Sequence, residues 1–387
     1  MTVPPNGFEG LLQDLLKAMG GAPSAAWFEA ARALAISVVS DDQEASNLDP
    51  VARIRLEELT GVVARHIAEA TGATADAAIE PVTRANWAVA ALTSWRPRLE
   101  PLVAAASDAP AIPDGEDPTT AMLARFAGAM GPMFLGLQVG STAGHLAEHA
   151  LGMSAFPLPW PGTSSALVVV RNVEQFSSDW SLDADAVSVF TIARELVART
   201  VYARPDVANR VERLLGDATA AQMAAQRSML QRLTDTEHPE DLTRLLSDPE
   251  EFLEGLPGLD GLADGPAHDA LNAAVTALSA YFDEVARRVA ERVVGNVAQL
   301  AEAWHRHRVG ESKGVENAVA LFGVDLSKER VELGQSFVEG VLEREGFDAL
   351  ARLTSSGAAL PTPAEIGAPG LWLARTALPE LGEPSGT

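Results

Sequence analysis

The sequence contains no cysteine, which excludes disulfides, thiolate zinc ligands and a cysteine nucleophile. Basic residues are also scarce, since 29 Lys and Arg stand against 53 Asp and Glu, for a formal net charge of -24. Nucleic acids and anionic membranes are bound through clustered basic side chains, so we expect neither as a partner. The apolar run 166–170 is far shorter than the ~20 residues of a membrane helix, and the N-terminus lacks a secretion-signal pattern. These absences together predict a cytoplasmic protein.

Several enzyme signatures are missing as well. The pairs Ser164-Ser165 and Ser355-Ser356 lack the Gly-x-Ser-x-Gly turn of serine hydrolases, and the chain has neither a Walker loop nor a dinucleotide-binding glycine pattern. What the chain does have is 387 residues, 47% of them hydrophobic, which is enough to bury a large core. The stretch 107–118, rich in Pro, Asp and Gly, predicts a linker between an N-terminal helical region (1–106) and a larger domain (119–387).

Helical periodicity dominates both regions, so we predict a mainly α fold with a small β-sheet. Trp27, Trp87 and Trp95 are the expected core anchors of the N-terminal region. The β-branched run Ala166–Val170 is the one strand that the sequence predicts clearly. The predicted helices are Phe8–Met19, Ser24–Val39, Pro50–Thr71, Thr83–Trp95, Leu99–Ala106, Thr119–Met133, Phe134–Leu151, Ala186–Ala203, Val207–Leu215, Ala218–Leu233, Ala267–Val294, Asn296–Arg308 and Leu326–Glu345, with a polar segment before Pro266.

The predicted helix Ala186–Ala203 is apolar nearly all round, which is typical of a helix buried at the centre of a domain. Asp183 stands where a carboxylate can cap the free N–H groups of its first turn, and Pro205 ends it. Only three charged residues interrupt the apolar pattern, namely Arg194, Glu195 and Arg199.

In zincin metallopeptidases a central helix carries His-Glu-x-x-His, whose two imidazoles bind zinc while the Glu activates the metal-bound water. The corresponding positions here read Arg194-Glu195-Leu196-Val197-Ala198. The Glu is kept, and both histidine positions are occupied by residues that cannot bind zinc.

Other short stretches support this comparison, because together they keep the order of one known family. They are Gln138-Val139-Gly140, Leu151-Gly152, Pro157-Leu158-Pro159, Arg171-Asn172-Val173-Glu174-Gln175-Phe176, Tyr281-Phe282-Asp283-Glu284-Val285, Leu321-Phe322-Gly323-Val324-Asp325-Leu326 and Leu360-Pro361-Thr362-Pro363-Ala364-Glu365-Ile366. On these stretches the chain resembles the actinobacterial zincin-like family often labelled zinc-dependent metalloprotease or hydrolase, some members of which are associated with deazaflavin-coenzyme biosynthesis.

The resemblance implies a zincin-like fold, and it also implies a third, acidic zinc ligand on a later helix, shortly before Tyr281-Phe282-Asp283. The matching position in this sequence is Ser279, with Ala280 beside it. All three ligand positions, Arg194, Ala198 and Ser279, therefore carry residues that do not bind zinc. We expect no metal and no other cofactor at this site.

Glu195 has two interpretations. It can be a retained general base, although without a metal there is no activated water to deprotonate. The alternative is a structural polar link, because Arg199 follows one turn later in the favourable order for an ion pair and Arg194 is adjacent. We favour the structural interpretation.

A second zinc pattern lies outside the central helix. His145-x-x-Glu148-His149 matches the inverted zincin signature, with both imidazoles on one helix face and a neighbouring Glu as base. No third ligand can be named from the sequence, and a polar helix face is the simpler interpretation.

The run Trp304-His305-Arg306-His307-Arg308 is basic and aromatic in an otherwise acidic chain. It can dock an acidic protein partner or an anionic ligand, or it can be a solvated helix end whose cations suit the helix dipole.

Three functional hypotheses follow. The first is a catalytically inactive zincin-like protein that binds or scaffolds a protein partner, through Trp304–Arg308 or the former substrate cleft. The second is a zinc hydrolase that uses His145, Glu148 and His149. The third is a binding module whose former substrate cleft, beside Ala166–Val170, holds a small apolar or peptide-like molecule.

Overall fold

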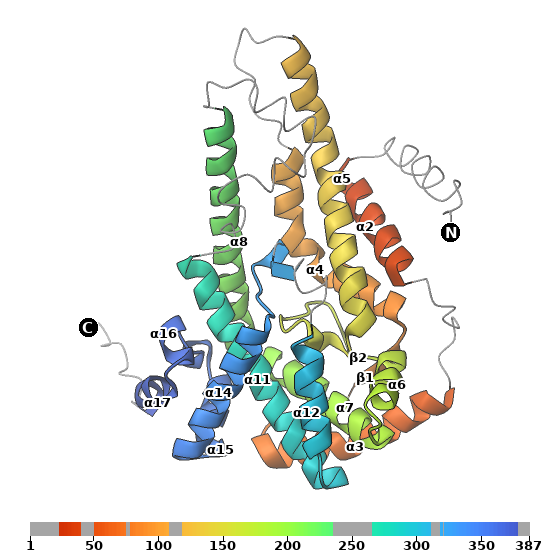
Figure 1. Cartoon of the computed structure of the whole chain (residues 1–387), viewed down its shortest axis with the longest axis vertical. Helices are drawn as coiled ribbons and strands as arrows, with labels where there is room; N and C mark the ends of the chain where they lie inside the picture. Colours follow the sequence, from red (N-terminus) through yellow and green to blue (C-terminus); the bar gives the residue numbers. More distant parts are fainter. Residues whose placement is uncertain are drawn as a thin grey trace, which may run out of the picture.

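The computed structural model describes residues 23–39, 50–74, 78–107, 118–234, 265–310, 318–319 and 321–377. These residues form a helical protein with one small sheet, as predicted (Figure 1). The predicted helix Phe8–Met19 and most of the polar segment before Pro266 lie outside the described residues. The elements are α2 (Pro23–Val39), α3 (Pro50–Thr71), β1 (Ile79–Val82), α4 (Arg84–Ser107), α5 (Pro118–His149), η1 (Met153–Ala155), β2 (Ala166–Val169), α6 (Val170–Asp179), α7 (Ala184–Tyr202), α8 (Pro205–Thr234), α11 (Pro266–Val294), α12 (Ala298–Arg308), α14 (Lys328–Glu345), α15 (Phe347–Leu350), η2 (Ala351–Thr354), η3 (Gly357–Ala359), α16 (Pro363–Ile366) and α17 (Pro369–Ala377).

Helix α7 is the buried central helix that the apolar pattern predicts. Its residues from Val189 to Ala198 are all buried, and it packs against α3, α6, α8 and α11. The side chain of Asp183 caps the helix by accepting a hydrogen bond of 2.9 Å from the backbone N–H of Ala186. A helix that is buried all round can expose functional side chains only toward internal cavities.

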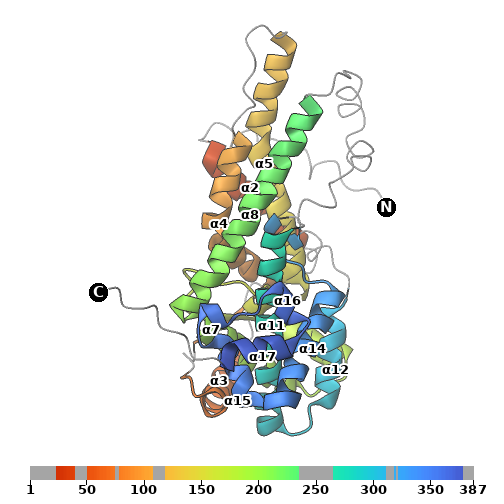
Figure 2. The same ribbon diagram turned by 90° about the vertical axis from the view of Figure 1, so that its left-hand side faces the viewer.

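Helices α2, α4 and α5 pack together in the N-terminal half of the chain. Trp27, Trp87 and Trp95 are fully buried there, which confirms their prediction as core anchors. Gly140 on α5 lies directly on the backbone of Ala31 on α2, at a distance that leaves no room for a Cβ atom. Helices α5 and α8 extend from the same end of the molecule, as a view turned by 90° also shows (Figures 1 and 2).

Three predicted helix breaks were wrong. Helix α4 runs through Pro97 and Pro101, and α5 runs through Pro132, although an interior proline costs a helix about 3 kcal/mol. In α4 buried apolar residues lie on both sides of the prolines, so both halves of the helix pack in the core. The predicted pair Val207–Leu215 and Ala218–Leu233 is likewise one helix, α8, in which Gly216 is accommodated.

The sheet consists of β1 and β2, which pair in parallel with Ile79 opposite Ala166 and Val82 opposite Val169. Strand β2 was predicted, one residue too long because Val170 already begins α6. Strand β1 was not predicted, because a four-residue strand containing a Glu-Pro pair has no strand pattern of its own. On its other side, β2 forms an antiparallel bridge from Val168 to Gly152. At that position the strand is therefore paired on both sides.

Helices from both sides of the predicted linker contact one another. Helices α2 and α4 pack on α5, and α3 packs on α7 and α11. Residues 108–117 of the linker lie outside the described part, so the division into 1–106 and 119–387 stays a prediction. Within the described residues, no helix has both the length and the apolar character needed to cross a membrane.

Candidate functional site

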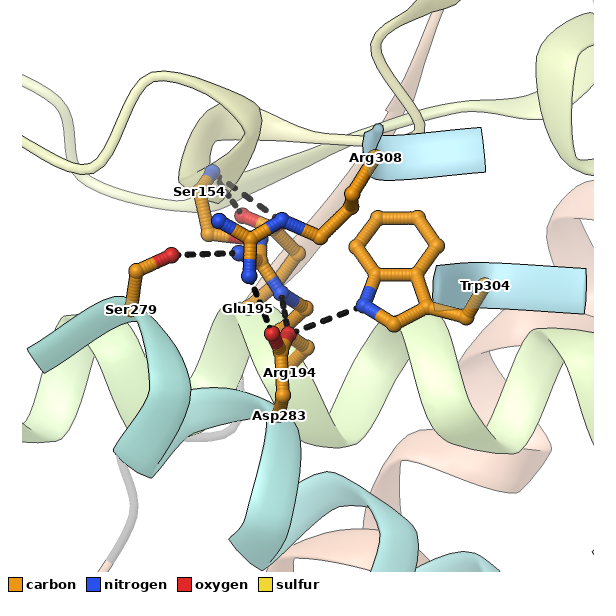
Figure 3. Close-up of polar contacts among 7 residues, drawn as sticks. All are labelled: Ser154, Arg194, Glu195, Ser279, Asp283, Trp304 and Arg308. Carbon is orange, nitrogen blue, oxygen red and sulfur yellow. Dashed lines mark hydrogen bonds and ion pairs between the residues drawn. The ribbon is translucent and has the colours of Figure 1, made fainter. Parts of the chain in front are cut away.

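The centre of α7 carries the candidate site. Arg194 and Glu195 are each 3% exposed; Arg194 meets side chains from three other parts of the chain, and Glu195 meets one of these parts (Figure 3). Ser154 comes from η1, Ser279 and Asp283 come from one face of α11, and Trp304 and Arg308 come from α12.

Arg194 is the hub of this cluster. Its Nε donates to Oδ1 of Asp283 at 2.6 Å, its Nη2 donates to Oγ of Ser279 at 3.2 Å, and its Nη1 donates to Oγ of Ser154. The guanidinium carbon also lies 5.1 Å from the ring centroid of Trp304, within the range of a cation–π contact. Arg194 therefore fixes α7 against α11, η1 and α12 at once.

Two of the three positions that the family resemblance assigns to ligands are thus in direct contact, since Arg194 bonds to Ser279. The third, Ala198, follows Glu195 on α7 and is 7% exposed. Helices α7 and α11 thus bring two of the three positions together, and one of these two residues has a cationic side chain.

Asp283 is the counter-ion of the cluster. It accepts hydrogen bonds from Arg194, from Nε1 of Trp304 at 2.9 Å and from Arg308, with which it also forms an ion pair. Burial alone would raise the pKa of Asp283, but the charges of Arg308 and Arg194 and these hydrogen bonds hold the pKa below its ordinary value. The carboxylate is therefore ionised, and it is the counter-ion of both Arg194 and Arg308.

Glu195 is held by η1, chiefly by Ser154. Its carboxylate accepts hydrogen bonds from the backbone N–H of Ser154 at 3.0 and 3.1 Å and from the Ser154 hydroxyl. Burial, the largest influence, raises the pKa of Glu195 to about 7, although Arg194 and the Ser154 hydrogen bonds oppose this rise. Gly152 makes the arrangement possible, because a Cβ there would overlap the Glu195 carboxyl group.

These contacts agree with the interpretation of Glu195 as a structural link, with Ser154 as the bonded partner. Arg199, the partner expected from helix spacing, donates from Nη1 to the carbonyl of Thr163 at 3.3 Å.

A cleft of about 500 Å³ opens on the Glu195 side of α7. Its walls come from α7, from the start of β2 and from the proline-rich loop 157–161. Its floor includes Glu195 and Ala198, and Tyr202 donates from its hydroxyl to the carbonyl of Pro157 at 2.6 Å, which ties the loop to the helix. The cleft lies beside Ala166, where the former substrate cleft was expected.

The inverted motif lies at the C-terminal end of α5. Nδ1 of His145 lies 3.0 Å from Oε2 of Glu148, and the backbone carbonyl of His149 accepts a hydrogen bond of 3.1 Å from Nε2 of His307. Across the described ranges, no three His, Asp or Glu side chains come together closely enough to hold a metal ion.

The basic run on α12 is less exposed than a docking patch would be. Trp304 is 6% exposed, His307 stacks on it, and Arg308 is paired with Asp283. Arg306 is exposed and pairs with Glu302 at 2.7 Å. The run instead lines a second cavity, of about 290 Å³, together with His145 and His149. The structure thus joins two motifs that the sequence analysis treated separately.

The sequence analysis missed the roles of Ser154 and Asp283. Asp283 belongs to one of the stretches that carry the family resemblance, which was the available signal. Ser154 belongs to no pattern, and only the packing of η1 against α7 brings it to the site.

Comparisons with known proteins agree with this architecture. A family model described as zincin-like metallopeptidase matches residues 27–373. A crystal structure from Chloroflexus aurantiacus, described as that of a candidate hydrolase with a novel fold, superposes with a TM-score of 0.60 at 18% identity. The match covers 91% of this chain and 99% of that one. No curated protein matches the chain.

Replacing Asp283 by Asn tests the cluster. We expect Asp283→Asn to lower the free energy of unfolding by about 3–5 kcal/mol, because two buried guanidinium groups lose their counter-ion. Urea unfolding measures this loss. The control is Asp185→Asn, which breaks the exposed pair with Arg55 and should cost less than about 1 kcal/mol. Equal losses in the two variants would contradict the assignment.

Replacing Glu195 by Gln tests its raised pKa. Between its ordinary value of 4.5 and about 7, the unfolded carboxyl group loses its proton while the folded one keeps it. The contribution of Glu195 to the free energy of unfolding therefore falls as pH rises through this window, by a total on the order of 3 kcal/mol. In Glu195→Gln this component of the slope should disappear, as measured by urea unfolding at several pH values.

The control for this titration is Glu100→Gln, which changes an exposed carboxylate paired with Arg96. It should keep the wild-type slope. The lowered pKa of Asp283 acts on the acid side, below this pH window. A Glu195→Gln curve parallel to that of the wild type would show that Glu195 does not titrate there.

Proposed function

The chain belongs to the family of zincin-like metallopeptidases, and on this premise we propose that it is a non-catalytic, metal-free member that works as a binding protein. The observation that carries the proposal is the position of the Arg194 guanidinium, which contacts Asp283 and Ser279, the second of these being another position that the family resemblance assigns to a ligand.

The residues at these positions do not fit a zinc ion. Zinc is bound by imidazole, thiolate or carboxylate groups, whereas the three positions offer a guanidinium, a methyl group and a hydroxyl. The guanidinium carries a permanent positive charge, and its N–H groups are hydrogen-bonded to Asp283 and Ser154. A second cation in the same place would be repelled. No catalytic step through zinc is therefore assigned to this site.

The cleft beside Glu195 supports a binding role. A cavity of about 500 Å³ is in the range of small-molecule sites, and its walls are largely apolar with a few polar groups. Leu158, Trp160 and three prolines provide the apolar surface, and Glu195 and Arg199 provide polar contacts. We propose that the cleft holds an apolar or peptide-like ligand. We also propose that the protein is cytoplasmic.

The alternative is a zinc hydrolase built on His145, Glu148 and His149. Its imidazoles line the second cavity, but Glu148 is engaged with His145, and no third ligand stands beside them within the described residues.

Metal analysis distinguishes the two functions. We expect protein purified without a tag or added zinc to contain far less than one zinc per chain and to lack peptidase turnover. His145→Ala should leave this unchanged. The matched control is His66→Ala, because His66 contacts Glu69 at 3.1 Å with the same three-residue spacing. About one zinc per chain, lost in His145→Ala and kept in His66→Ala, would establish the alternative.

Filling the cleft tests the binding role. Nile red, a neutral apolar fluorophore, should bind the wild-type protein and be displaced by a short apolar peptide. Ala198→Leu places a larger side chain in the cleft and should weaken binding by about tenfold, the consequence of about 1.4 kcal/mol.

Ala301→Leu is the control, since it makes the same change at a part-buried alanine of α12 outside this cleft. Equal binding by both variants would place the dye elsewhere and argue against the cleft as the binding site.

A further inference from the structure

The second cavity, which we call the basic pocket, lies between the C-terminal end of α5 and α12. Three arginines line it, Arg194, Arg306 and Arg308, and among the described residues no carboxylate does. This is unusual in a chain with a net charge of -24, where a random surface would be acidic. The basic pocket is thus a local concentration of positive charge.

The buried charges beside the basic pocket do not balance. Arg194 and Arg308 share one carboxylate, that of Asp283. The carboxyl group of Glu195 is instead hydrogen-bonded to Ser154 on the cleft side, and burial raises the pKa of this group to about 7. Arg194 and Arg308 are respectively 4% and 14% exposed at the side chain, so water screens them poorly. A buried charge without a full complement of opposite charge is costly. An anion in the basic pocket would supply the missing charge.

Donors are available for such an anion. A guanidinium carries five N–H groups, and the hydrogen bond of Arg308 to Asp283 uses only Nη1. Arg306 lies at the rim, where its side chain is 61% exposed. His307 adds no charge near neutral pH, because burial lowers its pKa, and its Nε2–H is donated to the carbonyl of His149.

Apart from His145 and His149, the remaining wall of the basic pocket is apolar. Leu146, Ala150, Leu151 and Leu326 form it, and the ring of Trp304 stacks on His307 with centroids 5.5 Å apart. A volume of about 290 Å³ equals that of about ten water molecules, which suits a small molecule. The charged end and the apolar wall together favour a ligand with an anionic head and an apolar body.

We propose that the basic pocket binds a small organic anion, with its carboxylate or phosphate group against Arg194 and Arg308 and its apolar body against Trp304 and Leu326. This ligand is separate from the one assigned to the cleft, because Arg194 faces the basic pocket and Glu195 faces the cleft. If the test of one site shows no binding, the proposal for the other site still stands.

Calorimetric titration tests this proposal in low-salt buffer, with benzoate, its neutral isostere benzamide, and inorganic phosphate as probes. Benzoate should bind at least about tenfold more tightly than benzamide, because only benzoate carries the charge that the arginines complement. If only phosphate binds, the ligand of the basic pocket carries a phosphate group. If only benzoate binds, the ligand carries a carboxylate on an apolar body.

Arg306→Gln is the variant, chosen because its exposed position leaves the buried cluster in place. We expect it to weaken binding of the preferred anion by about threefold to tenfold. Arg53→Gln is the matched control, since it removes one charge from the same kind of exposed pair, Arg53–Glu57 at 2.9 Å, compared with Arg306–Glu302 at 2.7 Å. It should bind like the wild type.

Three results would overturn the proposal. The first is no heat of binding with benzoate or phosphate up to about 10 mM. The second is equal affinity for benzoate and benzamide. The third is equal weakening in Arg306→Gln and Arg53→Gln, which would attribute the binding to overall charge.

Discussion

The guanidinium of Arg194 connects four separate parts of the chain at the centre of the molecule. It bonds to Ser279 and Asp283 of α11 and to Ser154 of η1, and it lies on the ring of Trp304 in α12. Removing such a group from water costs several kcal/mol unless its partners are correctly placed. The relative positions of α7, α11, η1 and α12 are therefore tied to one another.

The same cluster separates two cavities. Glu195 and Ser154 lie at the wall of the cleft, whereas Arg194 and Arg308 lie at the wall of the basic pocket. Because Ser154 bonds to both Arg194 and Glu195, the two cavities share one polar partition. A zinc ion is exchangeable and can activate water, whereas a guanidinium is a permanent part of the chain and cannot. Arg194 therefore supplies a permanent positive charge at the wall of the basic pocket, which suits the anion proposed for that pocket.

Much of the helical fold could be predicted from the sequence. The apolar periodicity of residues 186–203 located the central helix, the glycine at position 72 marked the end of α3, and the tryptophans marked the N-terminal core. Pro97 misled the prediction, because a local penalty of about 3 kcal/mol is smaller than the packing free energy of a long helix on its neighbours. Strand β1 was missed for a related reason, since its partner β2 lies more than eighty residues away in sequence.

The sequence by itself predicted that the zincin ligands are replaced, because Arg194, Ala198 and Ser279 stand at the positions that the family resemblance assigns to ligands. It also determined that α7 is buried, since a helix without a polar face has no stable position at the surface. Only the tertiary structure decided what Arg194 does, because Asp283, Ser154 and Trp304 reach it from distant segments. The basic pocket, too, exists only in the fold, where α12 packs beside the end of α5 and brings His149 and His307 into contact across 158 residues.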